Sequence, residues 1–225
     1  MKIELSKIVK GILEFKRVFF VYSLVLLTSV IIFGVSQVYP NIENTLSASR
    51  STPWGIITSI FAHINISHLA LNMGGLFLFM FLFAFCNSTF ILKSKRRVEI
   101  FFLVSVFVFA VISNVLWIAL TPNPSIGASG LVYAVESSLA GFSFANGLQL
   151  LYFSKFKAQS VSTMYIVFMN IVVFSVMLIQ IVQSPDIFLN VGQGVNIIAH
   201  GISFLLGFLI SPLWYYVIGK ISILN

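Results

Sequence analysis

The chain of 225 residues is 59% hydrophobic and only 8% charged, with a formal net charge of +7 and a mean hydropathy of +1.03. Soluble globular chains are about 45–50% apolar and about 25% charged, so a water-soluble fold of this length could not cover its surface with so few charges. The composition therefore predicts a polytopic membrane protein. With Cys86 as the one cysteine, it also excludes a disulfide scaffold.

The chain contains six apolar stretches of the length that a membrane-spanning helix needs, which is about 20 residues. We predict spans at 18–38, 68–85, 100–120, 129–145, 164–182 and 196–218. A basic amphipathic segment, 1–17, is expected to lie on the membrane surface before the first span, and 219–225 forms a short tail. The connection 39–67 is the only predicted loop with room for structure of its own.

The basic residues predict the orientation of these spans. Of the 13 Lys and Arg residues, all but Arg50 lie before span one, between spans two and three, between spans four and five, or after span six. By the positive-inside rule both termini are therefore cytoplasmic. The positive charge is a topology signal, with attraction to anionic lipid headgroups as a secondary effect, and its pattern argues against a nucleic-acid partner.

Polar side chains that persist in apolar spans usually face a bundle interior or a wet cavity. The three histidines, His63, His68 and His200, all lie at the outer ends of predicted spans. Ser129 lies at the outer start of span four, and Asn72 lies one turn below His68. Three spans that are far apart in sequence are thus expected to bring histidine, asparagine and serine side chains to a similar depth.

These residue types suit nucleophilic catalysis. A serine hydroxyl is a weak nucleophile until a base takes its proton, and imidazole has a suitable pKa, so Ser129 and His200 supply nucleophile and base. His68 and Asn72, at i and i+4, share a helix face and can donate hydrogen bonds to an oxyanion. Glycines on both sides of Ser129 predict a tight turn into a helix N-terminus, whose N–H groups favour an anion.

This combination resembles the rhomboid family of intramembrane serine proteases. That family shares a six-helix core, a G-x-S-G serine at the start of helix four, a histidine in helix six, and two histidines and an asparagine around the start of helix two. In this chain the serine motif is Gly127, Ala128, Ser129 and Gly130, and the other residues are His200, His63, His68 and Asn72. The resemblance covers about 54–207 and implies an all-α polytopic membrane protein with a six-transmembrane-helix rhomboid-like bundle.

By this resemblance, Ser129 and His200 form a dyad without an acid, and no metal or cofactor takes part. The oxyanion would be stabilised by the Ser129 backbone N–H with the side chains of His68 and Asn72. Tyr133, one turn after Ser129, matches the aromatic residue that stacks beneath the histidine of helix six.

The resemblance extends to the connection 39–67, with departures. His63 is expected to tie down this loop, and Trp54 is its tryptophan, a residue type that is most often an interfacial anchor. Many relatives follow this tryptophan with arginine, whereas here Gly55 follows. The glycine pair after the helix-six histidine is replaced by Ser203 and Gly207, a small-xxx-small spacing that still permits close approach to helix four.

Each of these residues also has a purely structural interpretation. Ser129 can serve as a helix N-cap or packing residue, His68 with Asn72 as a polar contact between helices, and Tyr133 as core packing. Glu136, seven residues after Ser129, is either a protonated carboxyl bonded within the bundle or part of a proton relay.

We therefore expect an intramembrane serine endopeptidase that cleaves peptide bonds in or beside the transmembrane helices of protein substrates. The alternative is a catalytically inactive relative that binds membrane helices. A compact chain without an appended soluble domain or cleavable targeting segment is expected in a prokaryotic plasma membrane, with its active site open to the extracytoplasmic side.

Overall fold

The computed structural model describes residues 5–88, 95–153 and 197–223, together with Phe168, Ile171, Val172 and Ser175. Within these residues the chain is helical, and its one β-type contact is an isolated antiparallel bridge between Ala48 and Ser125. The predicted span 164–182 lies outside the described residues except at those four positions, which stand alone.

Five long helices correspond to predicted spans one to four and six. They are α2 (Lys16–Val38), α5 (Ile66–Asn87), α6 (Lys95–Leu120), α7 (Ser129–Phe153) and α10 (Ile197–Ile223). Most of them extend beyond the apolar stretches that predicted them, because lysine, arginine and other polar residues continue the helix past the hydrophobic stretch. The helix α1 (Leu5–Leu13) lies in the predicted amphipathic segment.

Three of the described helices are long and apolar enough to cross a membrane, namely α2, α5 and α6, and a shorter apolar stretch runs over His200–Leu213 in α10. The chain is therefore a helical membrane protein. The count of six spans and the side on which the termini lie remain predictions.

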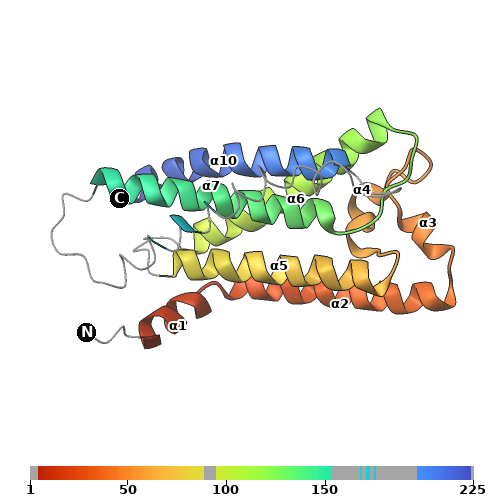
Figure 1. Ribbon diagram of the computed structural model, residues 1–225, viewed down its shortest axis with the longest axis horizontal. Helices are drawn as coiled ribbons and strands as arrows, with labels where there is room; N and C mark the ends of the chain where they lie inside the picture. Colours follow the sequence, from red (N-terminus) through yellow and green to blue (C-terminus); the bar gives the residue numbers. More distant parts are fainter. Residues whose placement is uncertain are drawn as a thin grey trace.

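The connection between α2 and α5 contains three short helices, α3 (Ile42–Leu46), α4 (Gly55–Thr58) and the 3-10 helix η1 (Ser59–Phe61). Figure 1 shows α3 and α4 at one end of the bundle, with α1 and the end of α10 at the other. The helices α2 and α5 lie side by side, and α7 packs against α5, α6 and α10.

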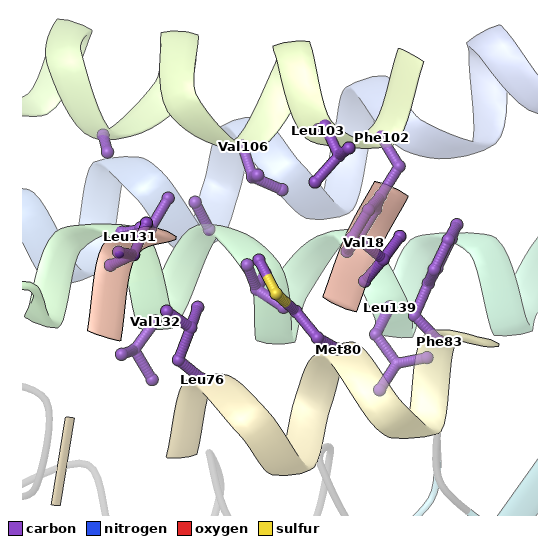
Figure 2. Packing of buried hydrophobic residues seen from close by; sticks show 14 of the residues in the cluster. Val18, Leu76, Met80, Phe83, Phe102, Leu103, Val106, Leu131, Val132 and Leu139 are labelled. Carbon is purple, nitrogen blue, oxygen red and sulfur yellow. The ribbon is translucent and has the colours of Figure 1, made fainter. Parts of the chain in front are cut away.

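The core lies where α5, α6 and α7 meet (Figure 2). Its aromatic centre is a stack of Phe83 on Phe102, with ring centroids 3.7 Å apart, and Phe142 packs edge-on against both rings. Toward the end of the bundle where α5 and α7 begin, aliphatic side chains and a methionine fill the space between the helices. They include Leu76, Met80, Val106, Leu131 and Val132.

Small residues bring α7 and α10 into close contact, as their spacing predicted. A Cβ at Gly207 would meet the side chain of Ser137 and would lie 3.0 Å from the backbone oxygen of Ala134. The Ser137 hydroxyl donates to the carbonyl of Ser203 at 3.2 Å. The residues that carry the candidate site on these two helices are therefore fixed to one another by direct backbone approach.

A buried carboxylate caps the start of α2, a contact that sequence reasoning missed. Glu99 of α6 is only 1% exposed and accepts hydrogen bonds from the backbone N–H groups of Arg17 at 2.6 Å and Val18 at 3.0 Å. The Arg17 guanidinium also pairs with Glu99 at 2.9 Å. Because Phe15 at the N-cap supplies no side-chain acceptor, Glu99 accepts from the Arg17 N–H, and it shares the Val18 N–H with the carbonyl of Phe15 at 3.1 Å.

Candidate active site

The turn before α7 is fixed by backbone hydrogen bonds to the α2–α5 connection. Ser125 exchanges two bonds with Ala48, at 2.8 and 3.0 Å, and the N–H of Gly127 donates to the carbonyl of Ser59 at 2.9 Å. Gly127 has φ +122°, a conformation that L side chains rarely adopt. We call the residues from Ser125 to Ser129 the serine turn, because α7 begins at Ser129 where the turn ends.

The serine turn lies directly against two side chains of α5. A Cβ built on Gly127 would lie 2.5 Å from Cε1 and 2.8 Å from Nε2 of His68, and 3.7 Å from Nδ2 of Asn72. Only a glycine permits this approach. The predicted grouping of His68 and Asn72 beside the serine motif is thus present in the fold.

The two α5 side chains are positioned by the start of their own helix. Asn65 is the N-cap of α5, and its side chain accepts the backbone N–H of His68 at 2.8 Å. Asn72 is 7% exposed, and within the described part of the chain its amide nitrogen has no hydrogen-bond partner. An unpaired buried donor is costly, so an acceptor placed beside Asn72 would be stabilised by its amide.

His200 is buried in α10, with 3% of its surface exposed. Its ring lies against Tyr133 of α7, with centroids 4.2 Å apart and planes inclined by 40°. The ring of Tyr133 therefore contacts that of His200, and the supporting role that the resemblance implies for Tyr133 stays a prediction.

Ser129 is partly buried at the first position of α7. Neither ring nitrogen of His200 has a hydrogen-bond partner among the described residues, so the serine–histidine hydrogen bond is not formed in this arrangement. Such bonds are often long before substrate binds. The first N–H groups of α7 add the positive end of the helix dipole beside Ser129.

The third histidine, His63, packs against His68. His63 precedes α5, is 1% exposed, and packs edge-on against His68 with ring centroids 5.2 Å apart. Burial, followed by the effect of His68, lowers the pKa of His63 to about 4. His63 is therefore neutral at pH 7 and places an uncharged ring against His68.

The remaining predicted residues surround the site. Trp54 is half exposed, and its indole N–H donates to the carbonyl of Thr45 at 2.8 Å, within the connection. Gly130 is buried in the first turn of α7. Glu136 is buried, with 3% of its surface exposed. No group of three metal-ligating side chains occurs in the part of the chain that the structure describes.

Two residues that sequence reasoning left without a role connect α6 to the loop above the site. Asn114 donates to the carbonyl of Ile56 at 3.0 Å and to the hydroxyl of Ser59 at 3.2 Å. Arg50 donates to the carbonyls of Ile118 and Ala119, both at 3.2 Å, at the end of α6. Both residues carried a signal in the sequence. Asn114 is an amide within an apolar stretch, and Arg50 is the one basic residue on the outer side of the predicted membrane.

The fold and the site together define a helical membrane protein with a cluster of serine, histidine and asparagine side chains near one end of its bundle. The Rhomboid domain family matches residues 50–217. The chain therefore belongs to the rhomboid family, as its motifs indicated. A comparison with curated proteins returned no match.

Proposed function

We propose that this protein is an intramembrane serine endopeptidase in which Ser129 is the nucleophile and His200 the general base. The observation that supports this most is the packing of Gly127 against His68 and Asn72 immediately before the serine helix. Membership of the rhomboid family, which is generally made up of intramembrane serine proteases, supports the same assignment.

In this proposal the Ser129 hydroxyl attacks the scissile carbonyl as His200 accepts its proton. The negative charge on the tetrahedral oxygen is stabilised by the Ser129 backbone N–H and by donors on His68 and Asn72. The amide of Asn72 suits this role because it is buried without a partner, so little reorganisation precedes the reaction. His200 then protonates the leaving amine, and water hydrolyses the acyl-enzyme by the reverse sequence of proton transfers.

The Tyr133 ring supports His200 from one face and limits its rotation. This contact takes the orienting role that a carboxylate plays in a serine–histidine–aspartate triad. Glu136 is expected to be a neutral bundle residue, since it lies seven residues after Ser129 and about 10 Å further along the helix.

The proposed topology has six spans in one membrane domain, 18–218, between a surface segment, 1–17, and a tail, 219–225. The basic residues favour cytoplasmic termini and an active site open to the extracytoplasmic side, in a prokaryotic plasma membrane. The substrates would be transmembrane proteins, met in the lipid bilayer. A substrate helix must unwind locally, because its carbonyls are otherwise occupied by intrahelical bonds.

A second function, binding of membrane helices without cleavage, is favoured by one observation. Neither ring nitrogen of His200 has a hydrogen-bond partner among the described residues, so no bond to His200 activates the Ser129 hydroxyl in this arrangement. The two functions differ in whether Ser129 is activated.

The test is covalent labelling of the purified protein, in detergent and in liposomes, with a fluorophosphonate that reacts with activated serines. We expect the parent to be labelled, and Ser129→Ala and His200→Ala each to lose labelling by about 1,000-fold or more, because members of a dyad act as a unit. Circular dichroism and thermal midpoints establish that the variants are folded. A folded parent that is neither labelled nor able to cleave a generic transmembrane substrate would refute the protease and favour helix binding.

A further inference from the structure

Asn114 is a buried amide near the end of α6, with 6% of its surface exposed. Its Nδ2 donates to two acceptors of the α2–α5 connection, the carbonyl of Ile56 in α4 and the hydroxyl of Ser59 at the start of η1. Both acceptors lie more than fifty positions away in the sequence. Asn114 therefore fixes the junction of α4 and η1 to a long helix of the bundle.

The same junction carries the serine turn. The carbonyl of Ser59 accepts the N–H of Gly127, while its hydroxyl accepts from Asn114. Ser59 thus connects the amide of α6 with the turn through one residue that is only 1% exposed. A shift of the α4–η1 junction would move Gly127 with it.

The turn has little room to absorb such a shift. Gly127 lies against His68 and Asn72 with no space for a side chain, and Ser129 follows two residues later. On the other side of the connection, a Cβ on Gly55 would meet the backbone of Ser47 and Ala48. Close-packed contacts of this kind transmit a displacement and do not absorb it.

Resting on the proposed function, we infer that Asn114 is a positioning residue for the reaction. Through Ser59 it sets the backbone of the serine turn, and therefore the distance from Ser129 to the donors on His68 and Asn72. It acts through Ser59 and not as a catalytic residue. A misplacement of about 1 Å at a reacting centre can cost about 100-fold in rate, so this indirect contact has a measurable effect.

The experiment measures the rate of fluorophosphonate inactivation as a function of probe concentration, which separates kinact from KI. Asn114→Leu keeps the side-chain shape and removes the donor. We expect kinact to fall by about tenfold or more, with KI within about twofold, because the probe still enters the site but meets a displaced serine. Ser59→Ala, which removes one acceptor, should lower kinact by a smaller factor. The double variant should be no slower than Asn114→Leu, because both changes break one connection.

A matched control is Asn87→Leu. Asn87 is also a buried asparagine whose amide donates to a backbone carbonyl, that of Phe83 at 2.8 Å, in the last turns of α5. We expect both variants to lower the thermal midpoint. If kinact of Asn87→Leu stays at the parent value, a loss of stability alone does not explain a lower kinact of Asn114→Leu.

The outcomes separate the two proposals. A folded parent that is neither labelled nor able to cleave a generic transmembrane substrate defeats the proposed function. A labelled parent with unchanged kinact in folded Asn114→Leu overturns only the positioning role, as does a change confined to KI. If Asn114→Leu does not fold, kinact of Ser59→Ala is used instead. A lower kinact supports the positioning role, and an unchanged kinact overturns it.

Discussion

Replacing Gly127 with alanine tests the geometry of the site most directly. The new Cβ would lie 2.5 Å from Cε1 of His68, whereas an ordinary contact begins at about 3.4 Å, so the ring or the turn must move by about 1 Å. The φ of +122° adds backbone strain of about 1–3 kcal/mol for a residue with a side chain. A displacement of this size at the reacting centre predicts a fall in kinact of about 100-fold.

The assay is fluorophosphonate labelling at saturating probe, together with the thermal midpoint in the same detergent. Gly74→Ala is the control, because a Cβ at Gly74 on α5 meets nothing within 4 Å. Alanine there should leave labelling unchanged and stabilise the helix by up to about 1 kcal/mol. If Gly127→Ala labels within threefold of the parent in a folded protein, the reasoning that places His68 against the serine turn is refuted.

Two further predictions concern the support of the site. Gly207→Ala should separate α7 from α10, because its Cβ would meet Ser137 and the backbone of Ala134. We expect a loss of about 1–3 kcal/mol and slower labelling, while Gly201→Ala, with open space around it, lowers neither the stability nor the labelling rate. Glu99→Gln should lower the free energy of unfolding by about 2–3 kcal/mol, because the amide replaces a charged acceptor of three hydrogen bonds. Lys95→Gln, which removes a pair with the half-exposed Glu14, should cost less than about 1 kcal/mol in the same denaturation experiment, and equal losses would contradict the assignment of Glu99 as the cap.

The sequence predicted the long helices because a membrane imposes a local requirement. Each apolar stretch must satisfy its own backbone, so length and hydropathy suffice to locate it. The boundaries were less predictable, as α6 shows by beginning at Lys95, in a basic stretch outside the predicted span. The start of α2 depends on Glu99 from another helix, and no pattern within the first span could indicate that partner.

For the candidate site, the sequence predicted which residues lie near one another but not how their side chains are oriented. The positions of Ser129, His68 and His200 follow from their depth in predicted spans, and the closeness of Gly127 to His68 and Asn72 agrees with that prediction. Side-chain orientation does not follow from depth. The contact of Tyr133 with His200 came from the family resemblance, and the structure confirms the contact while its role remains a proposal.

The departure at Gly55 has a physical reason that the sequence alone could not provide. A Cβ there would overlap the backbone of Ser47 and Ala48, so position 55 accepts no side chain, and an arginine after Trp54 would force the connection open. The positive charge lies instead at Arg50, whose guanidinium reaches the last carbonyls of α6, where a helix dipole favours a cation. Arg50 and Asn114 bind the connection to α6 from its exposed and buried sides. The connection is therefore held beside the serine turn without an arginine at position 55.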